Sequence, residues 1–162
     1  MSTRSIIGIL NSDGTATYVF CHWDGYPAHH APLLLEHYNT EDRVRQLLAQ
    51  GQIEVLDKYI SPEEVIGELE PAHKGLDVYN VDGWKHTDLT RAKDVCSFIL
   101  RDCDITHWSE EEKETSRAIT APLKEFGDKW GGQEYDYLFK NGEWYFRGKR
   151  WTKLTKKHYD IN

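Results

Sequence analysis

The chain of 162 residues has no long hydrophobic run. No stretch approaches the roughly 18 apolar residues that a transmembrane helix needs, so no membrane span is predicted. The N-terminal sequence MSTRSIIGIL has only a short apolar run before NSDG, which does not fit a signal peptide. We therefore expect a cytoplasmic protein that does not act at a membrane.

Cysteine is also scarce. The three cysteines are Cys21, Cys96 and Cys103, and an odd number cannot pair completely. Cys96 and Cys103 do not have the CxxC spacing of redox or zinc motifs. We therefore expect reduced thiols, in agreement with a cytoplasmic location.

Familiar catalytic and phosphate-binding motifs are missing as well. The chain contains no G-x-S-x-G, no P-loop and no G-x-G-x-x-G. Its eight histidines include neither H-E-x-x-H nor a Cys/His quartet at zinc-finger spacing. We interpret them as surface and capping residues, and we predict no metal and no cofactor.

Charge is unevenly distributed along the chain. The net charge is −7, yet basic residues outnumber acidic ones after residue 139. The acidic body argues against general binding to DNA or RNA backbones. The basic C-terminal tail, at about 149–162, either touches phosphates, or packs against its own acidic body or stays solvated. We favour the second alternative.

The two ends of the chain have the pattern of β-hairpins. Near the N-terminus, residues 5–10 and 15–22 are rich in apolar and β-branched side chains and flank the turn sequence NSDG. A two-residue turn at Asp13-Gly14 would pair Ile9 with Tyr18 and would place Cys21 on the face of Ile6.

The C-terminal hairpin, EYDYLFKNGEWYFRGK, is the clearest element in the sequence. Asn141-Gly142 is the preferred dipeptide of a two-residue type I′ turn. The register that this turn sets makes every cross-strand pair either aromatic or oppositely charged. The pairs are Phe139 with Trp144, Tyr137 with Phe146, Lys140 with Glu143, Asp136 with Arg147, and Glu134 with Lys149.

Short helices are predicted between the hairpins from capping residues and apolar spacing. Their ranges are 32–38, 41–50, 61–69, 91–103 and 109–121. For VCSFIL, residues 95–100, a buried strand is the alternative, and 76–86 leave a further hairpin open. The order predicts a single α+β domain over 1–162, in which the two hairpins build an antiparallel sheet and the helices pack on one face.

The segment CHWDGYPAHHAPLLLEHY, residues 21–38, is the densest in functional side chains. Cys21 and His22 are adjacent on a strand and point to opposite faces, so they cannot form a thiol–imidazole pair there. His22 and Asp24 are two apart and can share a face. They would serve acid–base catalysis if the protein is an enzyme, or form a local hydrogen bond that pins the turn, which we favour.

The same segment offers aromatic side chains for a planar ligand such as a base or a sugar. Trp23, Tyr26, His29 and His30 are candidate ligand-binding residues, together with Trp130 in the glycine-rich segment 127–133. The alternative is structural, with Trp23 and Tyr26 filling the junction between the first hairpin and the following helix.

Parts of the chain resemble a known group of proteins. STRSIIGI, the DG turn, CHWDGYP and LLLEHY are similar to sequences of small proteins that tailed bacteriophages and prophages encode. YDYLF with GEWYF is similar to the end of those proteins. The resemblance covers residues 2–55 well and 134–147 loosely, and 56–133 have no counterpart. It implies an accessory protein acting on host machinery or host defence, and it carries over no catalytic residue.

Three functions are therefore considered. The first is a phage-encoded binding protein of the host cytoplasm that engages a host protein or sequesters a small, nucleotide-like ligand. The second is a small hydrolase or nucleotide-processing enzyme using His22 and Asp24. The third is a structural or virion-associated protein. The edge of the last hairpin also leaves a homodimer open.

Overall fold

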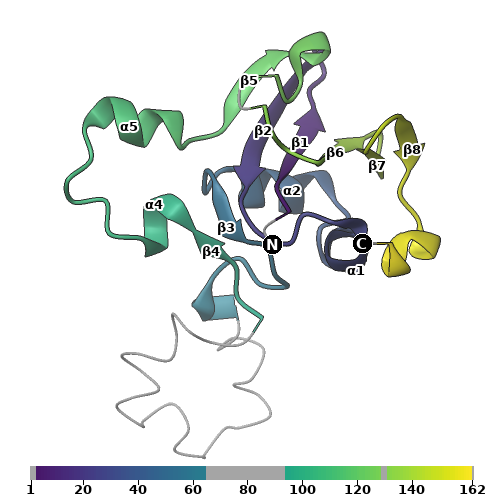
Figure 1. Cartoon of the computed structure of the whole chain (residues 1–162), viewed down its shortest axis with the longest axis horizontal. Coiled ribbons are helices and arrows are strands. Elements are labelled where there is room, and N and C mark those ends of the chain that lie inside the picture. The colour runs from purple at the N-terminus through teal and green to yellow at the C-terminus, as the bar shows by residue number, and fades with distance from the viewer. Residues whose placement is uncertain (1–2, 65–93, 129–130, 162) are drawn as a thin grey trace, which may run out of the picture. The chain divides into compact units, whose positions relative to one another are not determined.

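The computed structural model describes residues 3–64, 94–128 and 131–161 (Figure 1). The chain divides into two compact units, which comprise residues 1–56 with 97–162, and residues 57–96. The single domain expected over 1–162 therefore stays a prediction. The expected hairpin at 76–86 and most of the expected helix at 61–69 lie outside the described residues. None of the described helices is long and apolar enough to span a membrane.

An eight-stranded sheet organises the larger unit. The strands are β1 (Ser5–Leu10), β2 (Thr15–Cys21), β3 (Ile53–Val55), β4 (Ser97–Phe98), β5 (Ile119–Pro122), β6 (Tyr135–Lys140), β7 (Glu143–Arg147) and β8 (Trp151–Lys153). They follow the order β4-β3-β2-β1-β6-β7-β8, and β5 pairs with β2.

Helices connect and cover these strands. The described helices of the larger unit are α1 (Pro27–His37), α2 (Glu41–Leu48), α4 (Ile99–Asp102), α5 (Glu110–Thr115) and the 3-10 helices η3 (Leu123–Glu125) and η4 (Lys156–Asp160). The α+β class is confirmed, and the N- and C-terminal hairpins form the centre of the sheet (Figure 1).

The two hairpins meet through a parallel pairing. Ser5 pairs with Tyr135 and Ile9 pairs with Phe139, so β1 and β6 run side by side in one direction. Most residues of both strands are buried, as is typical of parallel strands with both faces covered. The sheet is therefore mixed rather than antiparallel throughout.

The N-terminal hairpin has a longer loop than predicted. Gly14 N–H donates to Asn11 O at 3.1 Å, and Gly14 has a φ of +87°, so a type I turn is followed by a left-handed glycine. This three-residue loop pairs Ile9 with Thr17, and the predicted pairing with Tyr18 was wrong by one residue. Because one residue reverses the face, Cys21 pairs with Ser5 and does not share the face of Ile6.

The C-terminal hairpin agrees with the prediction from Asp136 to Arg147. Asn141 and Gly142 have φ values of 53° and 80°, as a type I′ turn requires. Phe139 pairs with Trp144, and their ring centroids are 5.2 Å apart. The Asp136 carboxylate lies 2.8 Å from the Arg147 guanidinium. The expected pair of Glu134 with Lys149 lies beyond the ends of β6 and β7.

Two predicted helix boundaries were wrong. The first helix begins at Pro27 rather than Pro32, because Pro27 already provides a proline in the first turn and Ala28 N–H donates to Ile161 O at 2.6 Å. The helix predicted for 109–121 has its capping box at Ser109 but ends at Thr115. The residues that follow pair with β2 as strand β5, in agreement with their β-branched side chains.

Two further segments differ from a simple helix or a free tail. Residues 97–102 form the short strand β4 and then the single turn α4, so a helix through this part of 91–103 was wrong. The C-terminal segment is folded, since β8 pairs with β7 and η4 packs against α1. Leu154 and His158 in this segment are buried, which supports the packed alternative over a solvated tail.

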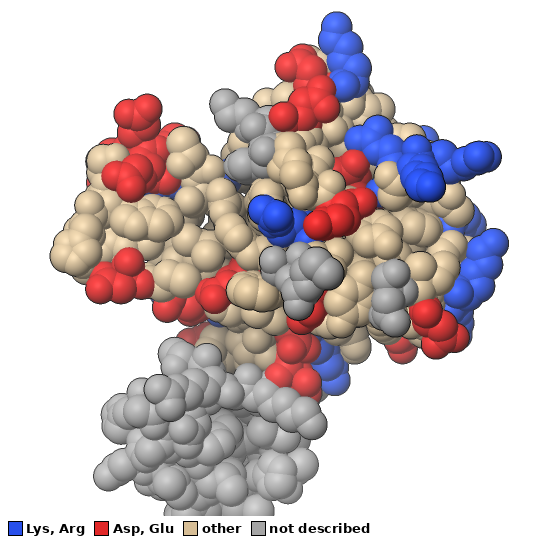
Figure 2. All heavy atoms as spheres, in the orientation of Figure 1, with Lys and Arg blue, Asp and Glu red and all other residues tan. Residues whose placement is uncertain are grey.

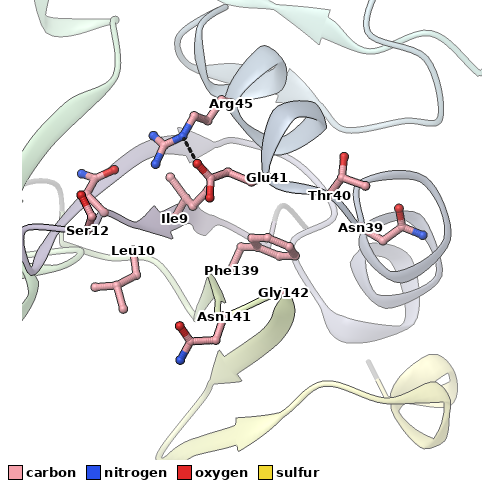
Figure 3. A pocket seen from close by; sticks show the side chains of 11 residues that line it. Ile9, Leu10, Ser12, Asn39, Thr40, Glu41, Arg45, Phe139, Asn141 and Gly142 are labelled. Atoms are coloured by element: carbon pink, nitrogen blue, oxygen red, sulfur yellow. Dashed lines mark hydrogen bonds and ion pairs between the residues drawn. The ribbon is translucent and has the colours of Figure 1, made fainter.

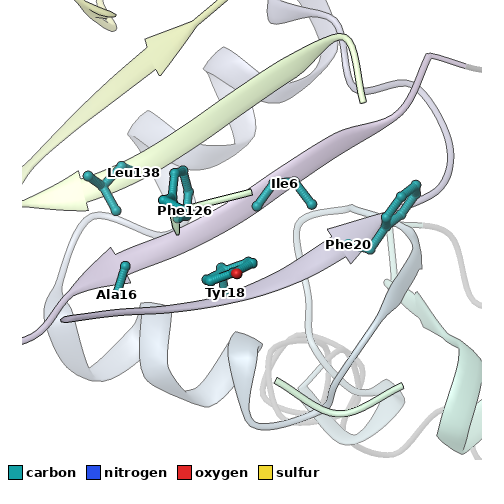
Figure 4. Packing of buried hydrophobic residues seen from close by; sticks show 6 residues of the cluster. All are labelled: Ile6, Ala16, Tyr18, Phe20, Phe126 and Leu138. Carbon is teal, nitrogen blue, oxygen red and sulfur yellow. The ribbon is translucent and has the colours of Figure 1, made fainter. Parts of the chain in front are cut away.

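Strand alternation gives the central strands two different faces. The helix-covered face includes Ser5, Tyr137 and Trp144, and Trp144 Nε1 donates to Tyr38 O at the end of α1 at 2.7 Å. The opposite face contains an apolar cluster of Ile6, Ala16, Tyr18, Phe20, Phe126 and Leu138 (Figure 4). One face is thus closed by helices, and the other is covered by the segment that contains η3.

Candidate functional site

The corner at residues 21–38, which the sequence singled out, is built around a buried histidine. His30 is fully buried, its Nε2 lies 2.9 Å from Ser5 Oγ, and its Nδ1 lies 3.0 Å from His29 Nδ1. Burial, and secondarily His29, lowers the pKa of His30 well below its usual value. A neutral imidazole donates one of these bonds and accepts the other, so His30 is satisfied inside the fold.

Strand β6 is held against this corner by contacts of Tyr137. Tyr137 donates its hydroxyl to Gly25 O at 2.6 Å, and its ring centroid lies 5.0 Å from that of His30. A Cβ at Gly25 would lie 2.7 Å from Ser5 Cβ, closer than real contacts allow. Burial raises the pKa of Tyr137 far above its usual value. These are the contacts of a structural junction.

His22 and Asp24 do not form the pair that acid–base catalysis needs. Gln52 Nε2 donates to Thr115 O at 3.3 Å, so its Oε1 accepts from His22 Nε2–H at 2.8 Å. Asp24 occupies a left-handed backbone position, with φ of 57°, where the chain turns away from β2. Among the described residues, no hydrogen bond joins the two side chains, so the local hydrogen bond favoured from the sequence is not formed. The bond of His22 to Gln52 does not prepare the imidazole as a base either.

The predicted ligand-binding residues fall into different settings. Tyr26 and His29 lie with ring centroids 6.2 Å apart, and His29 contacts the buried His30. Trp23 is 47% exposed. Trp130 lies outside the described residues. Neither of the two hollows discussed below is lined by Trp23, Tyr26, His29 or His30.

The cysteines offer no activated nucleophile in the larger unit. Cys21 is fully buried. Cys103 Sγ donates to a Glu54 carboxylate oxygen at 3.2 Å. Burial, followed by Glu54, raises the pKa of Cys103 to about 11, so it stays a thiol at neutral pH. Among the described residues, no three His, Cys, Asp or Glu side chains lie together as metal ligands would.

A groove lies instead on the face of the sheet opposite the helices. It has a volume of about 510 Å³ and is lined from η3, β6, β7 and β8. Its apolar lining consists of Leu123, Phe126, Leu138, Tyr145 and Trp151. We call this hollow the β6–β8 groove. Its size falls in the range of small-molecule sites.

The floor of the β6–β8 groove depends on a close approach to β1. Phe126 lies over Gly8, where a Cβ would be 2.6 Å from Phe126 Cε2. The absence of a side chain at Gly8 therefore lets the ring reach the sheet. There Phe126 meets Tyr18 edge-on, with centroids 5.1 Å apart, and lies 6.0 Å from the ring of Trp151.

The charge at the groove is positive, in contrast to the chain as a whole. Lys124, Lys140, Arg147 and Asp128 line it, and Arg147 is paired with Asp136 at 2.8 Å, which leaves the two lysines against Asp128. Arg147 also lies over the ring of Trp151, with its Cζ 4.7 Å from the centroid. In Figure 2, Lys and Arg side chains gather over the strands at the C-terminal end of the chain. The groove therefore favours an anion.

Apolar exposure is concentrated at the same place. The exposed large hydrophobic side chains among the described residues are Trp23, Leu123, Trp151 and Ile161, and two of these line the groove. Leu123 is 38% exposed and Trp151 is 41% exposed. An exposed indole beside cations can stack a flat ring while the lysines contact a negative group.

The sequence predicted the site at the corner of residues 21–38, with Trp130 as a further candidate, and did not indicate the groove. The signal that pointed to it was the basic C-terminal segment RGKRWTK, which contains both Arg147 and Trp151. Its possible contact with phosphates was considered and not favoured. The other side of the groove comes from η3, whose place on the sheet depends on contacts distant in sequence.

Comparisons with protein-family models, with curated proteins and with solved structures found no match for this chain.

Proposed function

We propose that this protein is a binding protein and that the β6–β8 groove holds a small anionic ligand with a flat aromatic part, such as a nucleotide. The observation that supports this most is the position of exposed Trp151 in one groove with Lys124 and Lys140, in a chain of net charge −7. Stacking on Trp151 would hold the ring. Lys124 and Lys140, for which the described residues provide no acidic partner, would hold the negative group.

A small ligand is favoured here over a host protein. A hollow of about 510 Å³ suits a single small molecule, and its charged and apolar groups converge from neighbouring elements. The resemblance of residues 2–55 to small phage and prophage proteins supports a setting for this activity. In that setting the protein would sequester the ligand in the host cytoplasm during host takeover or counter-defence.

The proposal is tested by titrating the full chain with adenosine monophosphate, adenosine and inorganic phosphate in a calorimeter. We expect the monophosphate to bind more tightly than either fragment, because only it carries both the ring and the charge. We expect Trp151→Ala to weaken binding by about 1–3 kcal/mol, the usual contribution of base–aromatic stacking. The double variant Lys124→Gln/Lys140→Gln should weaken binding of the monophosphate and leave that of adenosine unchanged.

The matched control is Trp23→Ala, which removes an indole of similar exposure (47% against 41%) outside the groove. Trp23→Ala should bind adenosine monophosphate with the same affinity as the unaltered protein. Binding lost in Trp23→Ala and kept in Trp151→Ala would move the site back to the corner at residues 21–38. No heat of binding with any of the three probes would contradict the proposal.

A further inference from the structure

A second hollow lies where β1 and β6 end side by side (Figure 3). The two strands are parallel neighbours, but the chain leaves β1 towards β2 and leaves β6 towards β7, on opposite sides. The two hairpin turns leave a hollow between them, beyond the carboxyl ends of the two strands. The hollow has a volume of about 440 Å³ and is closed on its third side by α2.

Polar groups with free hydrogen-bonding capacity line this hollow. Asn11 uses its amide N–H groups on Thr15 and Thr17, which leaves its carbonyl oxygen to accept. Thr40 accepts from Arg43 N–H to cap α2, which leaves its hydroxyl proton to donate. The Asn141 side chain extends from the type I′ turn at the edge of the hollow (Figure 3). Donors and acceptors thus both line this hollow.

The charge of this hollow is balanced. Arg45 Nε lies 3.1 Å from a Glu41 carboxylate oxygen, and these are its two charged lining residues. Arg45 keeps its terminal N–H groups, and Glu41 keeps its second oxygen, for a ligand. A balanced pair does not favour an anion, in contrast to the β6–β8 groove. It suits ligand groups, such as hydroxyls, that both donate and accept hydrogen bonds.

The floor of the hollow is apolar. Phe139 and Ile9 form it, and Figure 3 shows the Phe139 ring at its centre, between the turn at Asn141 and the first turn of α2. A ring of hydroxyl-bearing carbons has C–H groups on its faces and hydroxyls around its rim. Such a ligand matches an apolar floor surrounded by donors and acceptors.

We infer that this hollow is a binding site for a neutral sugar ring, separate from the proposed anion groove. Vicinal hydroxyls each donate and accept a hydrogen bond. They would span from Glu41 and Arg45 on α2 to Asn11 and Asn141 on the two turns. The inference does not depend on the β6–β8 groove, because the lining residues of the two hollows are different.

The test uses ¹⁵N-labelled full chain titrated with D-glucose, with glucose 6-phosphate as the charged comparison. Amide shifts should change at residues 10–12, 39–41 and 141–142, and glucose should bind at least as tightly as its phosphate. Arg45→Gln and Asn141→Gly should each weaken glucose binding roughly tenfold, as expected when a hydrogen bond to a charged group or a well-placed amide is lost. Glycine keeps the turn of Asn141 intact, because it accepts the same positive φ.

The matched control is Arg43→Gln, which makes the same change of charge on α2 outside the hollow. It should bind glucose as the unaltered protein does, and so should Trp151→Ala. Shift changes at the β6–β8 groove in place of the hollow, or tighter binding of glucose 6-phosphate, would overturn the inference. Equal weakening by Arg43→Gln and Arg45→Gln would overturn it too, and so would a complete absence of glucose-dependent shifts.

Discussion

The two faces of the central strands differ in what covers them. The helix-covered face is closed by α1 and η4, and its polar groups, His30 and Tyr137 among them, have partners inside the protein. The opposite face carries the β6–β8 groove, where cations and an exposed indole face solvent. Side chains of similar chemical type thus have different roles, and the packing above each face decides which role they take.

Residue type alone would place the functional site at the corner of residues 21–38. The corner at 21–38 contains four histidines, a cysteine and several aromatic rings. The fold uses His30 and Cys21 as buried structural groups. The groove contains no histidine and no cysteine, yet it combines an accessible hollow with an unbalanced charge. Accessibility and charge are better indicators of a site here than density of reactive residues.

The largest expected effect is a difference in stability between two leucine variants, one on each face of the central strands. Leu34 on α1 is 0% exposed, and Leu34→Ala should lower the free energy of unfolding by about 2–5 kcal/mol, since it removes buried methyl groups and leaves a cavity. Leu123→Ala in the groove should change it by less than about 0.5 kcal/mol. Urea denaturation of both variants measures the contrast. Equal losses would mean that the groove is part of the core.

A smaller effect is expected at Gly8, which connects the groove to the sheet. Gly8→Ala should cost about 1–3 kcal/mol, because the new methyl group would lie within 3 Å of Phe126, of Tyr18 and of the Thr17 backbone. It should also weaken ligand binding by displacing Phe126. Gly148→Ala is the control, since its Cβ would be 3.3 Å from the nearest atom, in the ring of Tyr135. Unchanged stability in Gly8→Ala would show that Phe126 has room to move.

The pH dependence of stability tests the closed face. His30 has a lowered pKa in the folded protein, and the unfolded chain titrates near 6.5, so the unfolded state binds the extra proton first as the pH falls. The free energy of unfolding should therefore be highest above pH 6.5 and decrease below it. One such group contributes at most about 1.4 kcal/mol per pH unit.

The measurement is a set of denaturation curves between pH 7.5 and 5. His30→Gln should reduce the slope below pH 6.5. A slope that His30→Gln does not alter would place the pH sensitivity in other groups.

The hairpins show how far the sequence predicts the fold. At Asn141-Gly142 the turn dipeptide, the aromatic pairs and the opposite charges agree, and the register was predicted correctly. At Asp13-Gly14 the same type of dipeptide belongs to a three-residue loop, because Asn11 and Ser12 start the turn earlier. The local sequence is compatible with both loops, and the pairing of β1 with β6 adds a constraint that lies far along the chain.

The candidate site was less predictable than the fold. Trp151 and Arg147 belong to one segment of the sequence. Leu123 and Lys124 come from η3, which precedes strands β6 to β8 in the chain. Nothing local places η3 over β6, because its position depends on Phe126 reaching Gly8. A groove formed in this way is a property of tertiary contacts, and periodicity along single elements does not reveal it.

The pairing of β1 with β6 also affects how the chain folds as it is made. Residues 5–9 are synthesised long before their partners at 135–139, because most of the described chain lies between them. Until then one side of the apolar strand SIIGIL has unsatisfied N–H and C=O groups, which is the kind of edge that joins other chains. Such long-range pairing also slows folding. A chain that is interrupted before the last hairpin should therefore aggregate, and efficient production depends on keeping the nascent N-terminal hairpin protected until synthesis reaches residue 140.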